Sequence, residues 1–139
     1  MKNKSERLVV LIVVAFAAVC AGLAGGGAEN GVEQISFTQN VVPVLKKYCL
    51  PCHAEESYNP SQLSLDNYEL MMEGGKHGPA VVGGKPQESL LIQKLYDKPP
   101  FGDMMPLPRR RKSAEPPRRL TDEELRILTE WVRQGARGN

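Results

Sequence analysis

Cys49-Leu50-Pro51-Cys52-His53 is the stretch of this 139-residue chain that decides its fold. Two thiols three residues apart, followed directly by a histidine, form the attachment signal of c-type haem. Residues i and i+3 of a helical turn share a face, so Cys49 and Cys52 can reach the two vinyl groups of one porphyrin. His53 then places an imidazole under the iron as the proximal ligand. The stretch therefore predicts one covalent haem c per chain.

Thiols at this spacing also occur in three other kinds of site. A redox-active dithiol usually starts a helix that follows a strand, and the residues before Cys49 show no strand pattern. A zinc site needs four ligands, whereas the chain after residue 28 offers two thiols and two histidines, His53 and His77. A disulfide between Cys49 and Cys52 would close a very short loop and stabilise little. Haem attachment is the favoured interpretation, and the dithiol is its main competitor.

Residues 1–28 differ in composition from the rest of the chain. Three basic residues within the first seven precede an uncharged run of 17 residues, 8–24, which small residues follow. This layout is typical of a secretory signal, so we expect export to the periplasm and cleavage that leaves 29–139 as the mature domain. A retained anchor facing the periplasm is the alternative, with 8–24 as the only membrane contact, because the run is barely long enough to span a bilayer. Lipidation at Cys20 is a third possibility.

The net positive charge of the chain comes from this N-terminal segment. Without residues 1–28, 15 basic residues face 15 acidic ones, so nothing in the charge balance favours a nucleic-acid partner. The sharpest remaining feature is a basic run that begins with Arg109, Arg110 and Arg111. We interpret it as a docking patch for an acidic redox partner near the haem, with a solvated loop as the alternative.

The second axial position of a haem iron decides between electron transfer and ligand chemistry. Met104 and Met105 lie in a loop, 99–108, that contains four prolines. Thioether sulfur is a soft donor that stays bound to reduced iron. We predict Met105 as the ligand rather than Met104 because Pro106 restrains the Met105 backbone to an extended form; the alternative is that both methionines only fill gaps. The lesser candidates are His77, in a glycine-rich turn, and Met71 and Met72, which are expected to pack.

Three helices are predicted in the first two thirds of the domain. Apolar residues recur at helical spacing before Cys49, with Asn40 as the expected N-cap and Pro43 at the third helical position. Two short helices are expected over 66–73 and 86–96, each next to glycine or proline.

The clearest predicted element is the last helix. Thr121-Asp122-Glu123-Glu124 is a capping box, and the apolar spacing that follows predicts a helix to Gln134, where Gly135 stops it. Trp131 lies on the apolar side of this helix and is expected in the core. The chain has 13 glycines and 11 prolines, so the predicted fold class is all-α, with short helices and long loops around one haem.

Taken in order, these features resemble the planctomycete-type cytochrome c domain, a relative of the small class I cytochromes. Besides the haem motif, the resemblance rests on Leu63-Ser64-Leu65-Asp66, Gly74-Gly75, Gly78-Pro79-Ala80-Val81-Val82, Gly84-Lys85-Pro86, Met105-Pro106, Leu120-Thr121 and Trp131 to Ala136. The chain departs from the family pattern at Ala54 and Gln62, where glycine is common, at Leu107, where proline is usual, and in its arginine-rich insertion.

The resemblance implies a class I cytochrome c-like fold around the haem, with His53 as the proximal ligand and Met105 as the distal one. The function that it implies is an exported electron carrier rather than an enzyme. The alternative is a haem c enzyme or sensor, peroxidase-like or gas-binding, in which the sixth iron position is open or labile.

Overall fold

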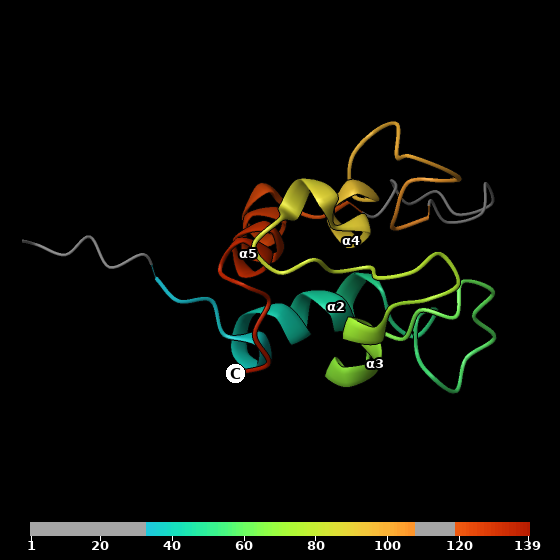
Figure 1. Cartoon of the computed structure of the whole chain (residues 1–139), viewed down its shortest axis with the longest axis horizontal. Coiled ribbons are helices and arrows are strands. Elements are labelled where there is room, and N and C mark those ends of the chain that lie inside the picture. The colour runs from blue at the N-terminus through green and yellow to red at the C-terminus, as the bar shows by residue number, and fades with distance from the viewer. Residues whose placement is uncertain (1–32, 108–118) are drawn as a thin grey trace, which may run out of the picture. The chain divides into compact units, whose positions relative to one another are not determined.

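The computed structural model describes residues 33–107 and 119–139. Its helical elements in chain order are η1 (Phe37–Val41), α2 (Val42–Tyr48), α3 (Tyr68–Glu73), η2 (Pro86–Glu88), α4 (Leu90–Gln93) and α5 (Asp122–Arg133) (Figure 1). The described part of the chain contains no strand, only an antiparallel bridge between Gly75 and Gly78. For these residues the prediction of short helices joined by long loops is confirmed.

The helix before the haem motif starts with a wide turn. In η1 the Val41 N–H donates to Ser36 O, five residues back (3.3 Å), and α2 follows without a break. Pro43 lies in the first turn of α2, where a missing N–H costs little. The prediction of Asn40 as the N-cap is wrong. Ser36 caps the helix by accepting the Gln39 N–H, and the Asn40 side chain accepts the Ser36 N–H (2.8 Å), so the helix begins earlier.

The two predicted middle helices are shorter than expected. α3 begins at Tyr68 rather than at residue 66, with Asn67 as its N-cap, and the Asp66 carboxylate accepts the N–H of Glu55. The predicted helix 86–96 is divided into the 3-10 turn η2 and the single α-helical turn α4. Ser89 causes the division, since its buried hydroxyl hydrogen-bonds the backbone of the preceding loop and its own backbone is extended.

The last helix, α5, agrees with its prediction. Thr121 Oγ1 accepts the Glu124 N–H (3.2 Å), and Glu124 Oε2 accepts the Thr121 N–H (2.8 Å), which completes the capping box. The helix ends at Arg133, and Gly135 follows with a φ of 101°, a left-handed conformation that glycine adopts without strain.

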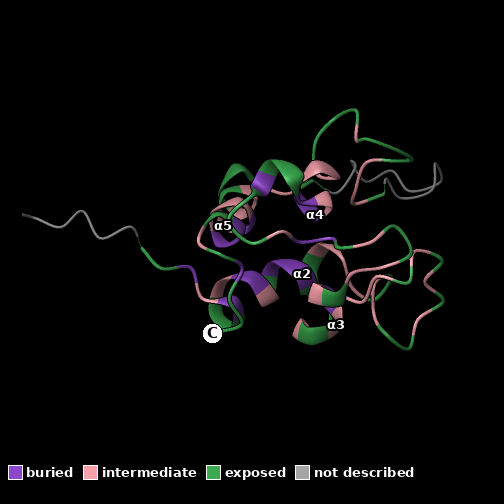
Figure 2. Ribbon diagram, in the orientation of Figure 1, coloured by how far each residue is buried: buried purple, intermediate pink, exposed green. Residues whose placement is uncertain are grey.

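The core of the domain surrounds Trp131. This side chain is 1% exposed, and its ring lies 5.5 Å from the ring of Phe37, centroid to centroid. Its Nε1–H donates to Arg137 O (2.9 Å), so the one polar atom of the indole is satisfied. The core position predicted for Trp131 is confirmed. Figure 2 shows the buried residues, which include Ile35, Val41, Val44, Leu45, Leu65, Met71, Val81, Leu91, Ile92, Leu128 and Val132.

The two ends of the domain are hydrogen-bonded to each other. The Phe37 N–H donates to Asn139 Oδ1 (2.9 Å), and the Thr38 N–H donates to Asn139 O (3.0 Å). The Ile35 N–H donates to Gln134 Oε1 (2.8 Å). These bonds fix η1 against the end of α5, so the helix that leads into the haem motif is anchored at its start.

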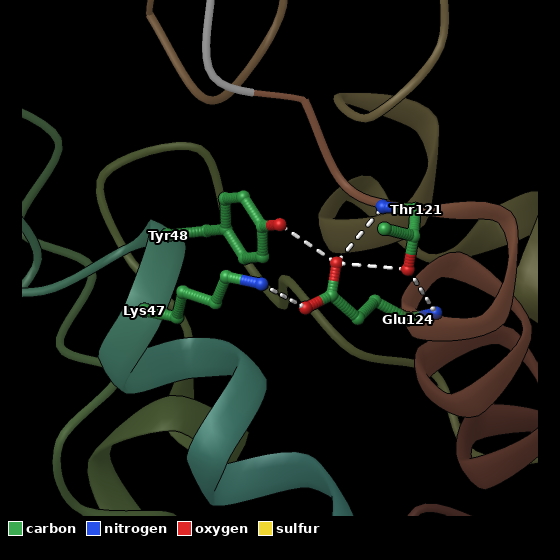
Figure 3. A network of polar contacts seen from close by, with 4 residues as sticks. All are labelled: Lys47, Tyr48, Thr121 and Glu124. Carbon is green, nitrogen blue, oxygen red and sulfur yellow. Dashed lines mark hydrogen bonds and ion pairs between the residues drawn. The ribbon is translucent and has the colours of Figure 1, made fainter.

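A second contact between the same helices lies next to the motif (Figure 3). Lys47 Nζ donates to Glu124 Oε1 (2.7 Å), and the Tyr48 hydroxyl donates to Glu124 Oε2 (2.7 Å). Desolvation alone would raise the pKa of Glu124, but the donors around it, with Lys47 first, lower that pKa to about 2. Because Tyr48 directly precedes Cys49, the network fixes the end of α2 at the point where the motif begins.

Several expectations concern residues that the structure does not describe. The signal or anchor at 1–28, with the apolar run 8–24 and Cys20, lies outside the described residues, as do Arg109, Arg110 and Arg111. Within 33–107 and 119–139, no helix has both the length and the apolar character needed to cross a membrane.

Replacing Glu124 with glutamine should destabilise the domain by on the order of 1 kcal/mol at pH 7, because charge-assisted hydrogen bonds become neutral ones. The lowered pKa of Glu124 means that its contribution is present above pH 4.5 and is lost as the pH falls toward 2. Urea unfolding of both proteins between pH 7 and pH 2 measures the difference.

The matched control is Glu123→Gln on the same helical turn, whose carboxylate is exposed and pairs only with Arg126 among the described residues. We expect a much smaller effect from it. A stability difference between wild type and Glu124→Gln that is the same at pH 7 and pH 2 would contradict this description of the network.

Candidate functional site

The two thiols and the histidine lie on the turn that follows α2. Cys49 is the C-cap of α2, and its N–H donates to Leu45 O (2.8 Å). The His53 N–H donates to Cys49 O (3.1 Å), which closes 49–53 into a single hydrogen-bonded turn. Cys49 is half-buried, Cys52 is exposed, and both are free thiols. The residues predicted from the motif are therefore together on one turn, as covalent attachment to a single porphyrin requires.

His53 is held through its backbone and through its ring. The Leu65 N–H donates to His53 O (2.7 Å), and His53 Nδ1 lies 3.2 Å from Leu63 O. A carbonyl oxygen can only accept, so Nδ1 carries the proton, and in the neutral ring the lone pair is then on Nε2. This is the tautomer that a histidine needs in order to bind a metal through Nε2.

Asn59 and Ser61 hold the Leu63 carbonyl in place. Asn59 Nδ2 donates to Leu63 O (2.6 Å), and the Ser61 hydroxyl donates to Asn59 Oδ1 (2.6 Å). One carbonyl oxygen thus accepts from both Asn59 and His53. The sequence did not predict this part of the site. The only sequence signal for this part of the site was that Leu63 belongs to the family resemblance. Hydrogen bonds from loop side chains to a main-chain oxygen leave no periodic pattern in the sequence.

The donors of this turn fit haem c. Two free thiols on one turn are available for thioether bonds, and the His53 imidazole offers Nε2 to iron. Burial raises the pKa of the Cys49 thiol to about 11, whereas a dithiol oxidoreductase works with a thiolate of low pKa. A zinc site would need more ligands, and among the described residues no three His, Cys, Asp or Glu side chains gather to hold a metal ion.

The loop that carries the two methionines is bound to the end of α4. The Met105 N–H donates to Lys94 O (2.7 Å), which fixes the Met105 backbone. Met104 Sδ accepts a hydrogen bond from Arg119 Nη1 (3.0 Å), while among the described residues no donor reaches the Met105 sulfur. Both methionines are half-buried. The loop's hydrogen bonds run to Lys94 and Arg119 rather than to the turn 49–53.

The remaining ligand candidates have other contacts. His77 is exposed, and its ring packs on that of Phe101 with 4.5 Å between the centroids. Met71 is fully buried in the core and Met72 is half-buried against it, in agreement with the packing roles expected for them.

Comparison with known proteins identifies this region. Residues 49–107 match the family model described as Planctomycete cytochrome C. The match starts at Cys49 and ends at Leu107, so it contains both thiols, His53 and Met105, but not the helices η1, α2 and α5. No curated protein and no solved structure matches the chain. A cytochrome c domain of this family binds haem c covalently. Over residues 49–107, the chain is therefore similar to the planctomycete cytochrome c family.

Proposed function

We propose that this chain is an exported one-electron carrier, a monohaem c-type cytochrome with His53 and Met105 as the axial ligands of its iron. The observation that carries the proposal is the His53 ring, whose Nδ1–H is bonded to Leu63 O and whose Nε2 is left for the metal. Cys49 and Cys52 lie on the same turn and within the family match. The proposed carrier turns over no substrate.

The surroundings of His53 support a carrier. When bound, haem c supplies an iron that gains and loses a single electron. The bond from Nδ1–H to Leu63 O fixes the orientation of the imidazole and makes Nε2 a stronger donor. Because Asn59 also holds that carbonyl, the ring keeps one orientation. A ligand that does not move when the charge on iron changes favours fast electron exchange.

The distal loop supports Met105 as the second ligand. A thioether is a soft donor that suits reduced iron, and two filled axial positions leave none for oxygen or peroxide. The Met105 backbone is fixed by its bond to Lys94 O, while the Met104 sulfur already accepts from the Arg119 guanidinium. Of the two sulfurs, that of Met105 is the one without a competing donor among the described residues.

The proposed partner is an acidic redox protein that docks near Arg109, Arg110 and Arg111. The mature chain has equal numbers of acidic and basic residues, so long-range steering has to come from a local patch of this kind. Phe101 and Leu107, in the loop just before the basic run, are 41% and 53% exposed. Apolar side chains of this kind suit the centre of an interface whose charges lie at the rim.

The proposed location is the periplasm. Residues 1–28 have the composition of a secretory signal, and covalent haem attachment at Cys49 and Cys52 is consistent with maturation outside the cytoplasm. A retained anchor through 8–24 would hold the domain at the membrane on the same side.

Replacing Met105 with alanine should remove the weak near-infrared band that sulfur ligation gives to oxidised haem. It should also open the reduced iron to carbon monoxide, because a sixth position becomes vacant. Met104→Ala is the matched control and should keep the band. Absorption spectra of the two purified holoproteins, with and without carbon monoxide, make the comparison.

Wild-type protein that lacks the band and binds carbon monoxide when reduced would contradict the carrier and favour the haem enzyme or sensor. Loss of the band in Met104→Ala but not in Met105→Ala would move the ligand by one residue and leave the function in place.

Replacing Arg109, Arg110 and Arg111 together with glutamine should lower the rate constant of electron exchange with a small acidic redox protein by about 10-fold at low ionic strength. The difference should shrink as added salt shortens the Debye length. Stopped-flow kinetics at several salt concentrations measure both effects. Arg126→Gln, on α5, is the control, and a basic redox protein as reactant should reverse the sign. Equal rates for the triple variant and wild type at low salt would contradict the docking patch.

A further inference from the structure

Lys94 connects the methionine loop to the core. It is the C-cap of α4, and its N–H donates to Leu90 O (3.0 Å). Two of the three residues between Leu90 and Lys94, Leu91 and Ile92, are buried in the core. Lys94 is half-buried, and its ammonium group reaches the carbonyls of the loop that follows.

Both ends of Lys94 bind the same loop. Its ammonium group donates to Asp103 O (3.1 Å) and to Phe101 O, and it lies 4.4 Å from the centre of the Phe101 ring. Its carbonyl oxygen accepts the Met105 N–H (2.7 Å). A lysine has three N–H donors and no competing acceptor, so two carbonyls can share it. Hydrogen bonds from a charged donor are also stronger than neutral ones.

Phe101 makes a second ring contact besides the one with the Lys94 ammonium group. The Phe101 ring, with the Lys94 ammonium near it, also packs on the exposed ring of His77. His77 lies in the turn between the bridged glycines Gly75 and Gly78. The loop is therefore bound at residues 101, 103 and 105 by one side chain and one carbonyl of the same residue.

We propose that Lys94 is the positioning residue for the distal ligand. It holds the 101–105 segment so that the Met105 sulfur stays on the iron in both oxidation states and small ligands are kept off. Lys94 itself does not touch the cofactor in this role. The proposal rests on the proposed function, because it assigns Lys94 to the ligand loop of that same carrier.

The test uses the full-length holoprotein with Lys94→Met, which keeps much of the side chain but removes all three donors. We expect the near-infrared sulfur band to weaken, carbon monoxide to bind reduced protein at least 10-fold faster, and the Met105 amide to exchange with deuterium about 10- to 100-fold faster. Lys94→Gln, which can serve one carbonyl, should lie between. Lys94→Arg keeps the positive charge and the donors, so it should match wild type in all three readouts. If Lys94→Met does not fold, the comparison of Lys94→Gln with Lys94→Arg makes the same test.

Lys98→Met is the matched control, since this lysine is exposed, lies directly before the loop 99–108, and makes no hydrogen bond or ion pair with the described residues. It should leave all three readouts unchanged. The role of Lys94 is overturned if Lys94→Met matches wild type while Met105→Ala loses the band, a result that leaves the carrier intact. If wild type lacks the near-infrared band, the proposed carrier function is contradicted instead. Unchanged deuterium exchange of the Met105 amide in Lys94→Met would separately contradict the role of Lys94 in holding the 101–105 segment.

Discussion

The hydrogen bond from His53 Nδ1 to the Leu63 carbonyl is the constraint on which the site depends. It selects the tautomer that leaves Nε2 free, and it fixes the plane in which the ring lies. The second tie, from the Leu65 N–H to His53 O, holds the backbone of the same residue. Together they make the motif turn and the segment 63–65 one unit, although nine residues of irregular loop separate His53 from Leu63 along the chain.

The rest of the domain fixes the position of the helix that leads into the motif turn. The helix formed by η1 and α2 is fixed at its start by Asn139 and at its end by the bonds of Lys47 and Tyr48 to Glu124. The buried Trp131 of α5 packs on Phe37 at the start of this helix. Since Tyr48 is bonded to α5 and Cys49 is the next residue, the position of the first thiol follows from packing between helices that are distant in sequence. A small core thereby gives a short motif a defined place.

Local patterns predicted much of this and missed the rest for a physical reason. The capping box of α5, the core position of Trp131 and the turn that carries the thiols each follow from spacing within a few residues. The start of the first helix was missed because the Asn40 side chain turns back to Ser36 instead of capping forward. Two features could not be predicted from the sequence: the bonds of Lys94 to the methionine loop, and the bond of His53 to the Leu63 carbonyl. Both involve main-chain oxygens, which every residue has and which no sequence pattern distinguishes.

Covalent attachment of one haem through Cys49 and Cys52 is the claim from which the carrier, its ligands and its positioning residue all follow. The intact mass of the purified protein, measured after denaturation, reduction and treatment with a thiol-alkylating reagent, tests it directly. We predict the mass of the polypeptide plus one haem, with neither Cys49 nor Cys52 alkylated. The mass of the polypeptide alone, with both of these thiols alkylated, would contradict the claim and return the two cysteines to a dithiol.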